Sequence, residues 1–296
     1  MVLPASRFLA ACAKEAETST STSPATTSPP NTAATTSTAP PPTAIDQPPA
    51  TEAPADAGAA ARIAAICRDA WGANPVGPGL EAHTIERLTV HHTAALLDSN
   101  RKAPARLRGH QAFHQSRGWP DLAYHYAVDA NGNVYEGRPT DYRGDTGTDY
   151  DPTGHFLVVA EGNFDSQDIP AAQVAGVAAV LAWAATRFGV SSETITGHRD
   201  WASTSCPGAS FYPLIADGSL RTATESLVAA GGVELEVACG DAAVARVAAI
   251  EAGTEPPASQ AGFFLRNSNT QGPADTEFTF GEPGWLPVAG EFGFGE

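Results

Sequence analysis

The chain contains 296 residues, 42% of them hydrophobic, and its formal net charge at pH 7 is −16. This length allows one or two domains. The acidic balance lacks the basic surface through which proteins bind nucleic acid or anionic lipid. No run of the sequence approaches the roughly 18 apolar residues of a membrane-spanning helix. Composition therefore sets aside nucleic-acid binding and membrane-spanning roles.

The N-terminal 58 residues differ in composition from the rest. Leu9-Ala10-Ala11-Cys12 has the small-residue pattern that precedes a lipidated cysteine, so residues 1–16 are interpreted as a truncated lipoprotein signal with Cys12 as the lipidation site. The alternative is a chance match in an Ala-rich stretch. Residues 17–58 are predicted to be a disordered linker, because 25 of the 37 residues between 18 and 54 are Ser, Thr or Pro. Such a segment cannot bury enough apolar surface to offset the loss of chain entropy.

Residues 59–225 are predicted to form an α/β domain, because strand-like and helix-like segments alternate along them. The first half contains a short helix at Ala60–Arg68, a strand at Thr84–Thr93, a helix at Pro104–Ser116 and a hairpin of Leu122–Asp129 with Asn133–Glu136. Asn131-Gly132 is the tight-turn signal of that hairpin. The second half contains an interior strand at His155–Glu161, a long helix at Ala171–Phe188 that ends at Gly189, and a short strand at Thr194–Thr196.

Three segments carry the residues suited to chemistry: Leu88–Thr93, Asp121–Arg138 and Gly197–Gly208. Neighbouring side chains of a strand point to opposite faces, so His91 and His92 cannot enter one site, and the more polar face favours His91. His198 and Cys206 lie eight residues apart in a loop that can bring both to one ion. Two His and one Cys suit Zn²⁺, and three protein ligands leave a position for water. The alternative for a lone strand histidine is a packed core residue.

In combination, these segments resemble a known superfamily. The sequences HHT (residues 91–93), DLAYHYAVDANGNVYEGR (121–138) and GHRDWASTSCPG (197–208) resemble those of type 2 N-acetylmuramoyl-L-alanine amidases and peptidoglycan recognition proteins, a group that includes phage amidase lysozymes. The resemblance runs from about residue 67 to residue 211 and implies a mixed central β-sheet flanked by helices. It also implies cleavage of the amide between N-acetylmuramic acid and L-alanine of peptidoglycan, with one zinc ion held by His91, His198 and Cys206.

The resemblance implies catalytic roles for further residues. Tyr124 would be the catalytic tyrosine, whose hydroxyl donates a hydrogen bond to the developing oxyanion or holds the water. Thr204, two residues before Cys206, would be an active-site residue. Glu161 is a candidate general base, because some amidases of the superfamily use a glutamate on this strand, two residues earlier. Glu161 shares a strand face with His155. Its alternative role is a rim carboxylate that pairs with an arginine.

Other residues near these motifs are expected to support the site. We expect His92, Trp119 and His155 to lie behind the ligands or in the substrate groove. His110 and His114 lie four residues apart on the predicted helix. A position in the groove wall or ordinary packing is expected for both, rather than a second metal site.

Residues 226–296 form an acidic, β-rich extension with ten acidic and two basic residues. Phe263–Asn269 and Phe278–Val288 resemble one unit of the FG-GAP-like surface repeats of secreted bacterial proteins. Gly290–Gly295 lacks the Asp residues of their calcium loop. Cys67 and Cys239 are predicted to form a disulfide, because they are the thiols that remain if Cys12 is lipidated or removed and Cys206 binds zinc. The alternative is two buried free cysteines that pack as small hydrophobic residues.

The sequence thus predicts a zinc-dependent peptidoglycan amidase that is secreted or held in a bacterial envelope, through a lipid at Cys12 if that residue is modified. The alternative is a non-catalytic peptidoglycan-recognition module of a surface protein. Members of that kind typically lose the zinc cysteine or the catalytic tyrosine, and this chain keeps both Cys206 and Tyr124. A weaker alternative is an adhesion protein that uses the amidase fold as a wall anchor.

Overall fold

The computed structural model describes residues 60–255, 262–265 and 276–279. Within these residues, seven strands form one sheet in the order β6-β2-β5-β3-β4-β1-β7. The strands are β1 (Ala61–Ile66), β2 (Arg87–His92), β3 (Tyr126–Val128), β4 (Val134–Glu136), β5 (His155–Ala160), β6 (Thr196–Gly197) and β7 (Val233–Ala238). β3 and β4 pair antiparallel, and every other neighbouring pair is parallel. This is the predicted mixed sheet.

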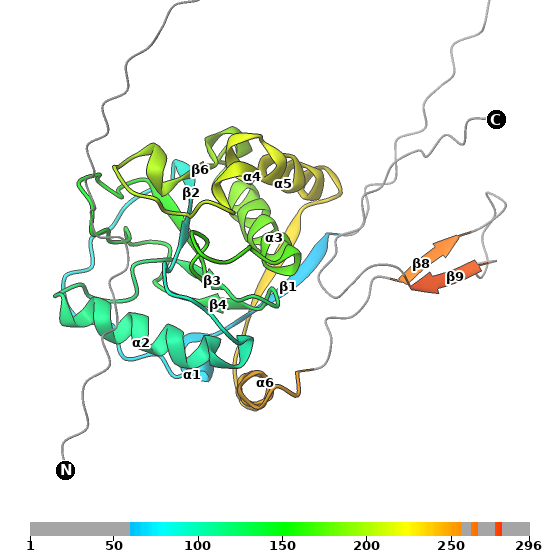
Figure 1. The fold of residues 1–296 in the computed structure, drawn as a ribbon, viewed down its shortest axis with the longest axis horizontal. Helices are drawn as coiled ribbons and strands as arrows, with labels where there is room; N and C mark the ends of the chain where they lie inside the picture. The colour runs from blue at the N-terminus through cyan, green and yellow to red at the C-terminus, as the bar shows by residue number, and fades with distance from the viewer. Residues whose placement is uncertain (1–59, 256–261, 266–275, 280–296) are drawn as a thin grey trace, which may run out of the picture. The chain divides into compact units, whose positions relative to one another are not determined.

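Helices cover both faces of the sheet (Figure 1). They are α1 (Arg68–Trp71), α2 (Ala103–Ser116), α3 (Ala171–Phe188), α4 (Tyr212–Ala216), α5 (Ser219–Ala229) and α6 (Asp241–Ala252), together with single 3-10 turns at Asn100–Lys102, Ser192–Thr194 and His198–Asp200. Helices α3, α4 and α5 pack on the face that carries Val90 and Val158. Helices α1, α2 and α6 pack on the opposite face, which carries Leu157 and Val159. The sheet therefore separates two apolar cores.

Several predicted elements are confirmed with nearly the predicted bounds. α3 spans Ala171–Phe188 and ends at Gly189, whose φ of 66° is the left-handed conformation that favours glycine. β3 and β4 form the predicted hairpin, with Gly132 at a φ of 83° in the turn between them. β5 is interior, because it lies between β2 and β3. Near Thr194–Thr196, the structure instead has a 3-10 turn at Ser192–Thr194 followed by the two-residue strand β6.

The predicted helix at Ala60–Arg68 is wrong, because the structure has β1 at Ala61–Ile66. β1 pairs with β4 on one side and with β7 on the other. Its Ala-rich sequence favours a helix locally, but the hydrogen bonds to two neighbouring strands override that preference. Both partners are distant in sequence, so a local pattern could not reveal them.

The α/β fold continues beyond residue 225. α5 runs from Ser219 to Ala229, β7 pairs with β1 along its whole length, and α6 packs in the core that contains Leu157. The predicted disulfide between Cys67 and Cys239 is present, with Cα atoms 5.3 Å apart. It joins the end of β1 to the residue after β7. β8 (Gly262–Leu265) and β9 (Thr276–Thr279) form a separate antiparallel pair. Cys12, the linker and Gly290–Gly295 lie outside the described residues.

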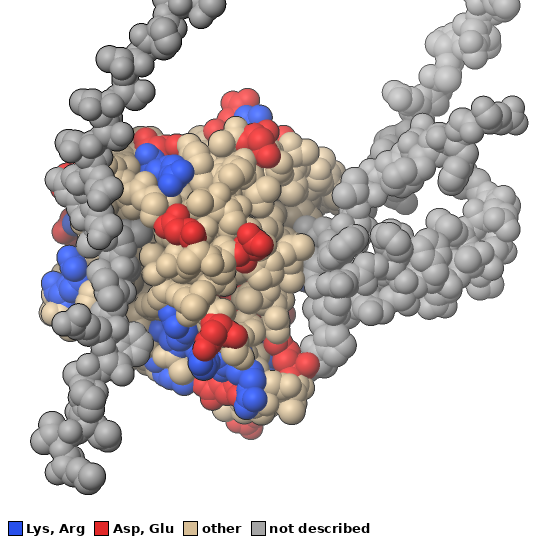
Figure 2. All heavy atoms as spheres, viewed as in Figure 1, with Lys and Arg blue, Asp and Glu red and all other residues tan. Residues whose placement is uncertain are grey.

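α3 is long and apolar enough to cross a membrane by length and composition alone, with a mean hydropathy of 1.3, but half of its residues are buried inside the protein. It is therefore a core helix of this fold. Figure 2 shows acidic and basic side chains interspersed on the visible face, separated by uncharged surface.

Candidate metal centre and active site

The three predicted metal ligands converge at one end of the sheet. β2 and β6 are parallel neighbours in which Val90 pairs with Gly197, so the next residues, His91 in β2 and His198 just after β6, lie side by side. Cys206 reaches the same point from the loop that follows. All three side chains are buried, and their candidate ligand atoms lie within 4.8 Å of one another. The structure thus assembles the set that the sequence predicted.

The alternation along β2 explains which histidine enters the site. Val90 belongs to the core under α3, whereas His91 pairs with Val159, which faces the core under α2. His92 faces the other way, and its Nδ1 accepts a hydrogen bond from the backbone N–H of Phe164 at 3.3 Å. His92 therefore lies behind the ligands.

The ligand atoms have the chemistry that a zinc ion needs. His91 Nδ1 lies 3.7 Å from Cys206 Sγ. Burial, and secondarily the nearby His198, hold the pKa of His91 well below its ordinary value, so this imidazole is neutral. His198 Nδ1 is buried and has no hydrogen-bond partner among the described residues. Two imidazoles and a thiol sulfur form a donor set that fits Zn²⁺.

Tyr124 lines a pocket together with the two candidate ligand histidines, His91 and His198. Its side chain is 5% exposed, and its ring centroid lies 5.2 Å from that of His91. The pocket is lined by His91, His114, Trp119, Tyr124, Asp145, Thr146, Gly147 and His198. Thus Trp119, predicted near the groove, lies in the pocket wall. A wider hollow next to it shares Asp145 and Thr146 and extends along residues 148–153 to Glu81 and Arg143.

The Gly137-Arg138 pair fixes the backbone of Tyr124. A Cβ atom at residue 137 would collide with the carbonyl oxygen of Tyr124, so this close approach requires glycine. The backbone N–H of Arg138 donates to that carbonyl at 2.9 Å. The Arg138 guanidinium is buried, donates to the carbonyls of Asp121 and Leu122, and pairs with the Asp145 carboxylate. This arginine therefore joins the Tyr124 segment to Asp145, which also lines the pocket.

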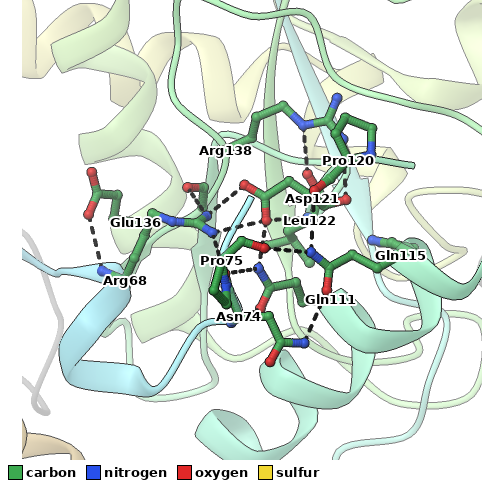
Figure 3. A network of polar contacts seen from close by, with 12 residues as sticks. Arg68, Asn74, Pro75, Gln111, Gln115, Pro120, Asp121, Leu122, Glu136 and Arg138 are labelled. Atoms are coloured by element: carbon green, nitrogen blue, oxygen red, sulfur yellow. Dashed lines mark hydrogen bonds and ion pairs between the residues drawn. The ribbon is translucent and has the colours of Figure 1, made fainter. Parts of the chain in front are cut away.

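Three residues before Tyr124 in the sequence, the buried carboxylate of Asp121 joins α1 to α2 (Figure 3). Asp121 is fully buried, and its Oδ2 lies 2.7 Å from Arg68 Nη1. Its Oδ1 accepts a hydrogen bond from Gln111 Nε2 at 2.7 Å. Pairing and hydrogen bonding together allow such a charge to be buried. The network holds the segment that precedes Tyr124 against both helices.

Two predicted catalytic residues do not line the pocket. The buried Glu161 pairs with Arg106 Nε at 2.8 Å and with His110 Nε2 at 3.0 Å, so it ties the end of β5 to α2. Thr204 Oγ1 accepts a hydrogen bond from the backbone N–H of Cys206 at 3.3 Å. These contacts are those of residues that hold neighbouring segments of the fold in place.

His155 and His114 are buried close to the site. His155 Nδ1 lies 2.8 Å from Thr89 Oγ1, and burial lowers the pKa of His155 to about 4. His114, for which a position in the groove wall or ordinary packing is expected, lines the pocket and accepts a hydrogen bond from the backbone N–H of Ala123 at 3.1 Å. Burial lowers the pKa of His114 to about 3. Both imidazoles are neutral at pH 7.

Sequence reasoning missed the loop between β4 and β5. Asp145, Thr146 and Gly147 line the pocket. Their segment, RGDTGTDYDPTG, has neither periodicity nor a recognisable metal-ligand pattern. Nothing in its local composition signals contact with histidines some 50 residues away.

Comparison with known proteins agrees with this geometry. Residues 81–209 match a family model described as N-acetylmuramoyl-L-alanine amidase. The chain is 31% identical to mouse peptidoglycan recognition protein 1 over 138 residues, which cover 45% of this chain and 75% of that protein. It is 32% identical to human N-acetylmuramoyl-L-alanine amidase over 166 residues, 53% of this chain but only 28% of that protein.

A solved structure is also similar. The crystal structure of Drosophila peptidoglycan recognition protein SD matches with a TM-score of 0.48 and 25% identity, and covers 52% of this chain and 93% of that one. The sequence matches and the family model agree on the same region. The chain therefore belongs to the family of N-acetylmuramoyl-L-alanine amidases and peptidoglycan recognition proteins.

Proposed function

We propose that the protein is a zinc-dependent amidase that hydrolyses the amide between N-acetylmuramic acid and the L-alanine of peptidoglycan. The observation that carries this proposal is the convergence of His91, His198 and Cys206 beside the pocket that Tyr124 lines. Three ligands, with no fourth in the same cluster among the described residues, would leave the open coordination position typical of catalytic rather than structural zinc. When bound there, zinc would polarise the amide carbonyl and activate water as the nucleophile.

The residues of this chain would bind and orient the reacting amide. Tyr124 reaches the pocket from a segment whose backbone is held by Gly137 and Arg138. Its hydroxyl would donate a hydrogen bond to the carbonyl oxygen as negative charge develops. A donor held in a fixed position stabilises this charge in the transition state more than a mobile donor does. Trp119 and the neutral His114 would form the wall that limits access of bulk water. The wider hollow beside the pocket would accommodate the stem peptide.

We assign no proton transfer to Glu161 or Thr204. The Glu161 carboxylate is already engaged by Arg106 and His110, and Thr204 by the backbone of Cys206. In this proposal Glu161 holds α2, the helix that carries His114, against the sheet. Thr204 holds the loop that carries the thiol.

The proposed setting is the bacterial envelope or the extracellular space. The Cys67–Cys239 disulfide supports an oxidising compartment. Lipidation of Cys12 and the FG-GAP-like character of the C-terminal residues remain predictions. Recognition of peptidoglycan without cleavage is the alternative function.

Digestion of purified cell-wall sacculi tests the proposal. The full chain should release stem peptides with a free L-alanine amine, detected by mass spectrometry, and a chelator should stop the release until zinc is restored. Cys206→Ser should lose both zinc and activity, because a hydroxyl is a weaker, harder ligand than a thiolate. Sedimentation with the sacculi but no released peptide would refute the amidase and support recognition alone. Full activity of Cys206→Ser without bound metal would refute the zinc centre.

A further inference from the structure

One loop, residues 145–151, contacts the imidazoles of both proposed histidine ligands. Thr148 Oγ1 lies 2.7 Å from His198 Nε2. The Tyr150 hydroxyl lies 3.4 Å from His91 Nε2. The Tyr150 ring also packs on His198, with centroids 5.0 Å apart. A hydroxyl from the same loop therefore faces the same ring nitrogen of each histidine.

The other nitrogen of each ring, Nδ1, is the one left for the proposed metal. His91 Nδ1 is the nitrogen that lies 3.7 Å from Cys206 Sγ. His198 Nδ1 is the buried nitrogen that lacks a hydrogen-bond partner among the described residues. A neutral imidazole that offers the lone pair of Nδ1 to a metal carries its proton on Nε2 and must donate it to an acceptor. The hydroxyl oxygens of Thr148 and Tyr150 are placed as those acceptors.

The loop is itself held in place by further contacts, which fix the positions of the Thr148 and Tyr150 hydroxyls. Thr146 Oγ1 lies 2.8 Å from Thr148 Oγ1 and accepts a hydrogen bond from the backbone N–H of Thr148 at 3.2 Å. Asp145 pairs with the buried Arg138. Arg138 also donates to the carbonyl of Arg143 at 2.6 Å, just before the loop. The loop is thus anchored to the segment that carries Tyr124.

We propose that Thr148 and Tyr150 are positioning residues that fix the tautomer and orientation of the two ligand imidazoles, so that His91 and His198 each bind the metal through Nδ1. The inference rests on the proposed metal centre but not on amide hydrolysis. Partners of this kind typically contribute a 10–100-fold increase in metal affinity. Neither residue touches the reacting amide in this role.

Zinc affinity of the full chain with its disulfide intact tests the inference, measured by competition with a chromogenic chelator. Thr148→Val and Tyr150→Phe should each weaken zinc binding about tenfold, and the double variant up to about 100-fold. Thr140→Val and Tyr142→Phe are matched controls on the same segment, because their backbone carbonyls make the contacts with His83 and His125. Both controls should bind zinc like the wild type. Thermal unfolding in excess chelator verifies that each variant is folded.

A second readout is nitrogen NMR of the zinc-loaded protein. Both histidines should show a metal-bound Nδ1 and a protonated Nε2 in the wild type. Ligation through Nε2 in either ring, wild-type zinc affinity in the folded double variant, or a wild-type protein that binds no zinc would overturn the inference. A protein that binds zinc as predicted but releases no stem peptide refutes the amidase proposal alone and upholds the positioning role.

Discussion

Arg138 offers the sharpest test of how the site is held together. Its side chain is 2% exposed, and its guanidinium donates to the carbonyls of Leu122, Arg143 and Asp121 at 2.9, 2.6 and 3.2 Å, and pairs with Asp145. Arg138→Met keeps an unbranched side chain but removes every donor. Three carbonyl oxygens and one carboxylate would lose their partner.

The expected loss follows from the burial of these groups. Removing one partner of a buried ion pair costs about 3–5 kcal/mol, since the remaining charge stays desolvated. The Asp145 side chain is 16% exposed, so water can solvate part of it. The unsatisfied carbonyls add to the cost, because each buried acceptor without a donor costs roughly 1–3 kcal/mol. We therefore expect Arg138→Met to lower the free energy of unfolding by about 3–5 kcal/mol, a large share of the ~5–15 kcal/mol of a typical domain.

Urea unfolding of the disulfide-bonded protein, followed by circular dichroism in the presence of chelator, measures this loss without a contribution from metal. Arg143→Met is the matched control, because the Arg143 and Glu81 side chains are 26% and 64% exposed. A pair so accessible to water contributes below about 1 kcal/mol. An Arg138→Met protein as stable as the Arg143→Met control would refute the reasoning that this network supports the Tyr124 segment.

Three further predictions concern catalysis, the disulfide and pH. Tyr124→Phe should lower turnover on sacculi about 10²–10³-fold with unchanged zinc content, because it removes one donor and keeps the ring; near wild-type turnover would assign Tyr124 a packing role. Replacing Cys67 and Cys239 by Ala should lower the free energy of unfolding by about 2–5 kcal/mol in urea, since the bridge spans a sequence separation of 172 residues; unchanged stability would contradict this. The free energy of unfolding should also fall as the pH drops from 7 to about 4. Burial lowers the pKa of three histidines from the ordinary 6.5, to about 3 for His114 and His125 and to about 4 for His155. In this pH range the unfolded chain therefore binds more protons than the folded protein. Burial raises the pKa of Asp129 to about 6, which has the opposite effect on stability and offsets about one of the three histidines. A rise in stability on acidification would contradict the conclusion that these three histidines are buried in the neutral form.

The sequence by itself determined the elements whose signals are local. α3 and its terminal Gly189, the hairpin turn at Asn131-Gly132 and the burial of β5 all follow from spacing and turn chemistry within a few residues. The alternation along β2 separated His91 from His92, because the period of a strand depends only on its own backbone. The ligand set came from the combined motifs, and the structure brings its three members together.

Only the tertiary structure decided what depends on distant partners. β1 is a strand because β4 and β7 pair with it, although its Ala-rich sequence favours a helix. Glu161 has the same carboxylate whether it acts as a base or as an ion-pair partner, and only the fold shows that Arg106 and His110 approach it from α2. The contact of Thr148 with His198 likewise spans 50 residues of sequence. Hydrogen bonds and ion pairs form between surfaces that the whole fold brings together, so no local pattern encodes them.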